Sequence, residues 1–166
     1  DLTEHQSSSL CEGQCDEGFF CGPASVNQTL CIAGGFCPKG ASSPRPCRAG
    51  TYRAELGGTS QASCNLTEPG FFSPTQSVQQ LPCNAGSFTS LPEQGSCELC
   101  LQGTFQNSKG QSACRACRVG FHCPNGSSVE LPATCRPGTY LPEGVDFRTE
   151  EDCSVCFPGS ACSGGR

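Results

Sequence analysis

The sequence contains no tryptophan and no methionine, and Leu, Ile, Val and Phe together supply only 28 of its 166 residues. So few large apolar side chains cannot fill one extensive core, which argues against a single globular enzyme domain. No apolar run is long enough for a membrane span or a signal peptide. The net charge of -5 carries no basic block, so neither a nucleic-acid groove nor a polybasic membrane patch is expected.

Cysteine is abundant instead, with 17 residues, and the chain also holds 21 glycines and 13 prolines. In a cross-linked chain this glycine and proline content indicates tight turns and not disorder. N-glycosylation sequons begin at Asn27, Asn65 and Asn125. Dense cysteine together with three sequons predicts a secreted glycoprotein, extracellular or at the cell surface.

A Cys-x2-Gly signature recurs along the chain at intervals of 16 to 21 residues. Its copies begin at Cys15, Cys31, Cys47, Cys83, Cys100, Cys117, Cys135 and Cys156, and Thr67 begins a ninth copy in which threonine replaces cysteine. Each repeat is named below by its first residue. The spacing predicts tandem repeats over residues 11–166, each too small for a core of its own and each stacked only on its neighbours. Residues 1–10 are expected to be a Ser-rich leader or linker, with or without O-glycans.

The repeats are of two kinds, which differ in the distance from the first cysteine to the next. In the short kind a second cysteine follows after five residues, and in the long kind it lies 14 to 18 positions on, with turn residues between. The long loops are expected to form small hairpins clipped at the base. The fold class predicted is therefore a small disulfide-rich one, an elongated tandem array of short β-hairpins with almost no helix and no single hydrophobic core.

The Thr67 repeat lacks two cysteines at once and so indicates the disulfide pairing. Alignment with the Cys117 repeat places Thr67 on Cys117 and Ser73 on Cys123. Because loss of one partner alone would leave a free thiol, the joint loss indicates that the two cysteines of a short repeat bond to each other. The long loops then close on themselves. The predicted bridges are Cys15–Cys21, Cys31–Cys37, Cys47–Cys64, Cys83–Cys97, Cys100–Cys114, Cys117–Cys123, Cys135–Cys153 and Cys156–Cys162.

Cys11 is left over by this scheme. It stands where a long loop would close, so its partner is expected upstream of Asp1, in a longer array of which this chain is a segment; a bond to another chain is the alternative. The glycine at the fourth position of each repeat is expected to supply either a positive φ or room for the aromatic ring that follows it. That ring is expected to pack over the adjacent disulfide.

The segments 37–52 and 131–140 resemble the ephrin-receptor-like cysteine-rich repeat, which is similar in style to tumour-necrosis-factor-receptor and EGF-like modules. The resemblance covers almost all of residues 11–162 and departs from the pattern at Thr67 and Ser73. Such repeats occur in receptor ectodomains, in large secreted matrix proteins and in arrays on protist surface proteins. The resemblance therefore implies an extracellular rod and not a reaction.

The sequence gives little support for a metal site or a catalytic site. The cysteines at 97, 100, 114 and 117 have nearly the spacing of a zinc ribbon, but they also fall in the register of the array. His5 and His122 have no evident nucleophile beside them. The acidic residues Glu143, Asp146, Glu150, Glu151 and Asp152 could ligate calcium but lack an ordered ligand spacing. We therefore assign no catalytic, cofactor or metal residue.

Two functions are compatible with these features. In the first, the chain is a non-catalytic structural module that spaces or assembles into a coat, matrix or filament, through contacts with copies of itself or with neighbouring surface or matrix proteins. In the second, it is a receptor-type module that binds a specific protein ligand. Regular repetition and the scarcity of Trp and Tyr favour the first function, because such side chains dominate binding hot spots. Arg45, Arg48, Arg53, Arg115 and Arg118 are expected to face acidic segments such as Glu150 to Asp152 in a partner copy.

Overall fold

A computed structural model of the chain describes residues 15–23, 25, 27–118, 120–132, 134–143, 145, 150–160 and 162. The predicted leader over residues 1–10, His5, Cys11 and Asp146 lie outside the described residues.

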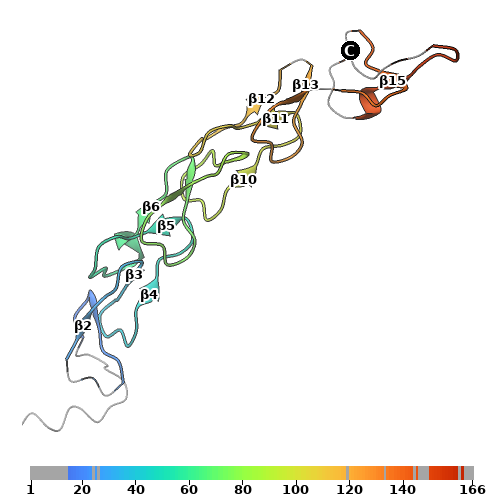
Figure 1. Ribbon diagram of the computed structural model, residues 1–166. Helices are drawn as coiled ribbons and strands as arrows, with labels where there is room; N and C mark the ends of the chain where they lie inside the picture. Colours follow the sequence, from blue (N-terminus) through green and yellow to red (C-terminus); the bar gives the residue numbers. More distant parts are fainter. Residues whose placement is uncertain are drawn as a thin grey trace, which may run out of the picture. The chain divides into compact units, whose positions relative to one another are not determined.

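The described residues form two-residue strands that pair into eight separate antiparallel hairpins (Figure 1). In chain order the pairs are β1 (Phe19–Phe20) with β2 (Thr29–Leu30), β3 (Gly35–Phe36) with β4 (Arg45–Pro46), β5 (Thr51–Tyr52) with β6 (Asn65–Leu66), β7 (Phe71–Phe72) with β8 (Leu81–Pro82), β9 (Ser87–Phe88) with β10 (Glu98–Leu99), β11 (Thr104–Phe105) with β12 (Arg115–Ala116), β13 (Phe121–His122) with β14 (Leu131–Pro132), and β15 (Thr139–Tyr140) with β16 (Ser154–Val155). Helix is limited to two 3-10 turns, η1 (Gln61–Ser63) and η2 (Glu150–Asp152), within the described part of the chain.

Each hairpin occupies the same place in its repeat. The first strand follows the fourth-position glycine, and the second strand comes just before the next repeat. The amide of Cys31 donates to the carbonyl of Gly18 at 2.8 Å, and the amide of Cys100 donates to that of Gly86 at 2.9 Å, which closes the hairpin base. Short and long repeats therefore contain the same kind of hairpin. In a long repeat the second strand lies just beyond the disulfide loop.

The buried apolar side chains are almost all cysteines. Among the described residues, the buried apolar ones are ten cysteines and Ala41. Half-buried Phe20 of the Cys15 repeat packs against Cys31 and Cys37, so its ring covers the bridge of the next repeat. The predicted fold class, with short hairpins and no single hydrophobic core, is confirmed.

Disulfides hold this arrangement together. They join Cys15 to Cys21, Cys31 to Cys37, Cys47 to Cys64, Cys100 to Cys114, Cys117 to Cys123, Cys135 to Cys153 and Cys156 to Cys162. Cys83 and Cys97 are also disulfide-bonded. Closing a 15-residue loop contributes about 3 kcal/mol in the chain-entropy model, so the bridges supply stability that the small core cannot.

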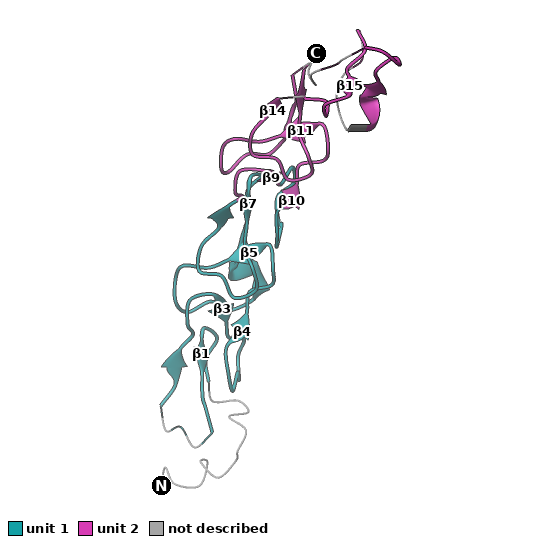
Figure 2. Ribbon diagram, turned by 45° about the vertical axis from the view of Figure 1, so that its right-hand side comes forward, with its two compact units in different colours: residues 1–82, 89–97 teal, residues 83–88, 98–166 magenta. Residues whose placement is uncertain are grey.

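Two compact units divide the chain (Figure 2). Unit 1 consists of residues 1–82 and 89–97, and unit 2 consists of residues 83–88 and 98–166. The Cys83 repeat therefore contributes to both, because its loop 89–97 belongs to unit 1. In the part of the chain that is described, no helix has the length and apolar character that a bilayer crossing requires.

Candidate interaction surface

A reciprocal pair of backbone hydrogen bonds joins each repeat to the next along the run from the Cys15 repeat to the Cys117 repeat. In unit 1, the amide of Gly50 donates to the carbonyl of Ser73 at 2.8 Å, and the amide of Gln76 donates back to the carbonyl of Cys47 at 2.9 Å. Unit 2 repeats the arrangement between the Cys100 and Cys117 repeats, where Gly103 donates to Cys123 at 2.8 Å. These bonds satisfy buried backbone groups that hairpins of two-residue strands would leave unpaired.

Some fourth-position glycines, namely Gly18, Gly34, Gly50 and Gly86, pack against a carbonyl from two repeats farther on, whereas nothing lies within 4 Å of a Cβ added at Gly103, Gly138 or Gly159. All nine fourth-position glycines have a positive φ, between 75° and 89°. A Cβ added at Gly34 would lie 2.4 Å from the carbonyl oxygen of Gln76, and one at Gly50 would lie 2.2 Å from that of Glu93. The glycine thus provides a positive φ together with room for a backbone carbonyl. The expectation that repeats contact only their immediate neighbours is wrong, because the bare glycine backbone lets the second neighbour approach.

In each reciprocal pair, the second bond is donated by an amide of the later repeat to a carbonyl of the earlier one. The residue that donates this second bond has a left-handed backbone conformation. This position is glycine at Gly40, Gly57, Gly110 and Gly126. It is Gln76 in the Thr67 repeat and Glu93 in the Cys83 repeat, with φ of 67° and 63°. These two are the non-glycine residues with positive φ in the described part of the chain, and a left-handed conformation costs an ordinary residue about 1–2 kcal/mol.

Two of the long repeats, the Cys83 and Cys100 repeats, carry a buried polar side chain where short repeats have their second cysteine. Thr89 and Gln106 occupy this position and are each 2% exposed. The Thr89 hydroxyl accepts from the amide of Gly70 at 2.8 Å, and the Gln106 amide group donates to the carbonyl of Ala113 at 2.7 Å. Sequence reasoning missed both residues. Their alignment with the second cysteine was the signal that could have found them.

Thr67 and Ser73 occupy the positions of the missing disulfide and are buried, with exposures of 1% and 0%. The Thr67 hydroxyl accepts from the amide of Gln94 at 2.9 Å, and the Ser73 hydroxyl donates to the carbonyl of Gln79 at 3.3 Å. Hydrogen bonds to backbone thus take the place of the covalent bridge in this repeat.

A side-chain clamp recurs across three of the repeats that have the short spacing. The Gln28 side chain accepts from the amide of Asp16 at 3.1 Å, and Gln80 does the same for Glu68 at 2.9 Å. Each glutamine also donates to the carboxylate of its partner. The clamp holds the first turn of the repeat against the residue before the second strand.

In the Cys117 repeat the clamp becomes an ion pair. Glu130 accepts from the Arg118 amide and from its guanidinium, each at 2.8 Å, and the guanidinium lies 4.7 Å from the centre of the Phe121 ring. The Arg118 amide bond holds the pKa of Glu130 below its ordinary value; partial burial opposes this, and the guanidinium reinforces it.

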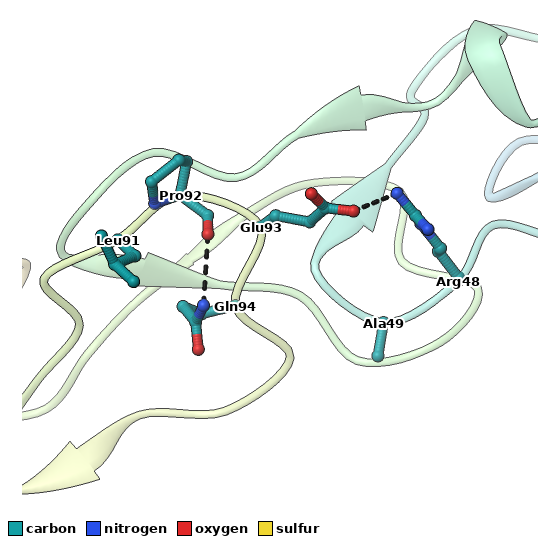
Figure 3. A pocket seen from close by; sticks show the side chains of 6 residues that line it. All are labelled: Arg48, Ala49, Leu91, Pro92, Glu93 and Gln94. Carbon is teal, nitrogen blue, oxygen red and sulfur yellow. Dashed lines mark hydrogen bonds and ion pairs between the residues drawn. The ribbon is translucent and has the colours of Figure 1, made fainter.

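Arg48 is also engaged within the chain, by Glu93 in unit 1 (Figure 3). The pair borders a hollow of about 480 Å³ whose other lining residues are Ala49, Leu91, Pro92 and Gln94. The carboxylate of Glu93 points toward the guanidinium of Arg48. Glu93, whose backbone has a positive φ, thus forms an ion pair that joins the Cys83 repeat to the Cys47 repeat.

The arginines expected to face a partner copy thus divide into two groups. Arg48, Arg53 and Arg118 bond within the chain, Arg53 by donating to the carbonyl of Ser63 at 2.7 Å, while the side chains of Arg48 and Arg118 remain 62% and 72% exposed. Arg45 on β4 and Arg115 on β12 are exposed. The side chain of Glu150 lies outside the described part of the chain.

Exposed apolar side chains flank the first cysteine of three repeats. Leu30 and Ile32 are each 41% exposed on either side of buried Cys31. Leu99 (62%) and Leu101 (73%) flank Cys100, and Val155 (78%) and Phe157 (73%) flank Cys156. Sequence reasoning did not single out these residues, although their place beside the cysteine is visible in the repeat.

The sequon asparagines Asn27, Asn65 and Asn125 are all exposed. The side-chain oxygen of Asn125 accepts from the amide of Gln102 at 2.6 Å, so the side-chain nitrogen of Asn125 takes no part in this bond. The hydroxyl of Thr67, which completes the second sequon, is buried in the folded chain. Modification at Asn65 is therefore expected before this repeat folds.

The cysteines of the zinc-ribbon alternative lie in disulfides. Cys100 bonds Cys114, Cys117 bonds Cys123, and Cys97 is also bonded. No group of three or more His, Cys, Asp or Glu side chains is placed to hold a metal ion in the described part of the chain. Of the acidic segment, Glu143 and Glu151 are exposed. His122 lies on β13 and is half-buried.

Repeated hairpins, disulfides and inter-repeat backbone ladders define an extracellular cysteine-rich repeat module of the kind found in multidomain secreted proteins. Residues 86–130 match the family described as "Tyrosine-protein kinase ephrin type A/B receptor-like". The resemblance to the ephrin-receptor-like repeat is thereby confirmed.

Longer proteins contain similar segments. The chain is 35% identical over 81 residues, 47% of its length, to "Sushi, von Willebrand factor type A, EGF and pentraxin domain-containing protein 1" of Rattus norvegicus and of Mus musculus. It is 31% identical over 106 residues, 52% of its length, to "Signal peptide, CUB and EGF-like domain-containing protein 2" of Homo sapiens. The match spans only 2% of the first two proteins and 10% of the third.

Proposed function

We propose that this chain is a non-catalytic structural module that assembles, with copies of itself or with neighbouring surface or matrix proteins, into a coat, matrix or filament. The observation that carries the proposal is the recurrence of exposed apolar pairs around the first cysteine of a repeat, at Cys31, Cys100 and Cys156. Because the repeat backbone fixes the positions of the two side chains, each pair presents a similar apolar surface to a partner.

The exposed pairs are large enough to matter for association. Full burial of one Leu or Phe side chain contributes about 1.5–3 kcal/mol, so a few such pairs can stabilise a contact against the cost of association. Exposed Arg45 and Arg115 supply charge at the rim of such a contact. The disulfides favour the same role, since they keep the repeats that contain them closed to proteases and resistant to pulling.

The test compares self-association of the native chain with that of Leu99→Ser/Leu101→Ser. Sedimentation velocity and electron microscopy of the glycosylated chain should show ordered assemblies that this variant loses. Leu91→Ser/Val129→Ser is the matched control, because these side chains are 63% and 55% exposed but do not flank a first cysteine. The control should assemble as the native chain does.

A different outcome would favour the receptor-type function. The scaffold proposal is wrong if the native chain stays a dispersed monomer that binds one soluble protein with nanomolar affinity through a single repeat. It is also wrong if both double variants reduce assembly equally, because general surface apolarity would then explain the association.

A further inference from the structure

Residues 65–82 form the longest run without a cysteine that follows Cys11. The run begins after the Cys47–Cys64 bridge and ends before Cys83, which is also disulfide-bonded. A disulfide-closed loop cannot lengthen under tension, because the bridge carries the load. The chain between Cys64 and Cys83 has no such protection.

Only non-covalent contacts of modest strength hold this run. β7 and β8 pair through two residues each, and one of the four is a proline, which cannot donate. The buried positions Thr67 and Ser73 contribute hydrogen bonds in place of a disulfide. A net hydrogen bond contributes about 0.5–1.5 kcal/mol, less than the bridge that equivalent repeats possess.

The residues with strained backbone conformations form hydrogen bonds that hold this same repeat. Gln76 lies inside the run, and its left-handed amide donates to the carbonyl of Cys47. Glu93, also left-handed, donates to the carbonyl of Thr67 at 3.1 Å. The two non-glycine residues with positive φ in the described part of the chain thus both serve bonds that fasten the Thr67 repeat. Strain of this kind clusters where a structure must change conformation.

We propose that residues 65–82 are a reversible opening segment, which unfolds locally while the disulfide-closed loops on either side stay closed. Opening would break the β7–β8 pair and also the β5–β6 pair, to which Asn65–Leu66 belongs, and it would expose Thr67 and Ser73. It would also lengthen the chain between Cys64 and Cys83 by at most about 60 Å. The segment is the longest stretch after Cys11 that can yield to tension without breaking a covalent bond. The proposal concerns the single chain and stands whether or not copies assemble.

Native-state hydrogen exchange of the oxidised, monomeric chain tests the opening. The amides of Gly70 and Gln76 should exchange faster than their equivalents Gly103 and Gly126 in disulfide-bonded repeats. A Thr67→Cys/Ser73→Cys variant should form the missing bridge. Closing that loop is worth about 2.3 kcal/mol in the chain-entropy model, so exchange at Gln76 should slow by up to about 50-fold. Equal exchange rates in the wild-type repeats would overturn the proposal.

Single-molecule pulling provides a second readout. The first extension of the wild-type chain should lie within the 60 Å bound, reverse on relaxation, and shorten by about 15 Å in the bridged variant. A first extension of unchanged length in that variant would place the opening elsewhere and contradict the proposal. If the variant fails to fold, the wild-type exchange comparison still decides, and neither measurement depends on self-association.

Discussion

Gly86 faces the carbonyl oxygen of Gly126 so closely that a Cβ added at position 86 would lie 2.2 Å from that oxygen. The two residues lie in repeats separated by one whole repeat, and both have positive φ. At Gly18, Gly34, Gly50 and Gly86, contacts of this kind require glycine at the fourth position of the repeat in addition to its backbone conformation.

Gly86→Ala should therefore destabilise the chain more than Gly103→Ala. Both residues have nearly the same φ, 84° and 83°, but nothing lies within 4 Å of a Cβ at Gly103. The φ cost of about 1–2 kcal/mol is shared, and the clash adds about 1–3 kcal/mol at Gly86. Denaturant unfolding of the oxidised variants measures the difference. Equal losses would show that φ alone selects the glycine.

Gln76→Gly should stabilise the Thr67 repeat by about 0.5–1 kcal/mol. Glycine removes the left-handed strain at φ 67°, and the entropy gained by the unfolded chain offsets part of that gain. Thr75→Gly is the control, since Thr75 does not have positive φ and should only lose stability. Midpoints of urea unfolding compare the two, and a loss in both variants would contradict the expected relief of strain.

Glu130 should titrate below the ordinary range for glutamate. A lowered pKa in the folded state stabilises the fold above the pKa of the unfolded chain, which is about 4.5, and this contribution disappears as the pH falls through the folded value. Arg118→Ala should raise the pKa of Glu130 only in part, because the Arg118 backbone amide remains. Carboxyl-carbon NMR titration measures both values. An unshifted midpoint in the native chain would contradict the clamp geometry.

Peptide mapping without reduction should recover Cys100–Cys114 and Cys117–Cys123 as separately linked loops. The basis is the joint replacement of two cysteines at Thr67 and Ser73, which leaves no free thiol in that repeat. A bond between Cys100 and Cys117, or bound metal in place of the bridges, would overturn the pairing scheme.

Asn27, Asn65 and Asn125 should carry N-glycans in native material. Enzymatic deglycosylation in heavy-oxygen water marks each modified asparagine. Because the Thr67 hydroxyl is buried after folding, slowing the folding of this repeat should raise occupancy at Asn65 and leave Asn27 unchanged. Three unmodified asparagines in native material would argue against secretion by the eukaryotic route.

The class of this protein can be recognised from its amino-acid composition and cysteine spacing. Cysteine spacing and the scarcity of large apolar side chains predicted short hairpins without a common core, because repeats this small must rely on cross-links. The phrases at 37–52 and 131–140 carried the resemblance that the match over residues 86–130 confirms. The sequence also located the exceptional repeat, since Thr67 and Ser73 interrupt the cysteine register.

The contacts between repeats depend on three-dimensional packing that the sequence does not reveal. The approach of Glu93 to Gly50 joins residues in alternate repeats. Because the loops differ in length, no constant sequence spacing separates the two residues of such a contact. The same packing turned Arg48 and Arg118, expected to face a partner, toward Glu93 and Glu130 of their own chain. It also buried Thr89 and Gln106, because a carbonyl from a neighbouring turn offered each polar side chain a partner that local sequence does not reveal.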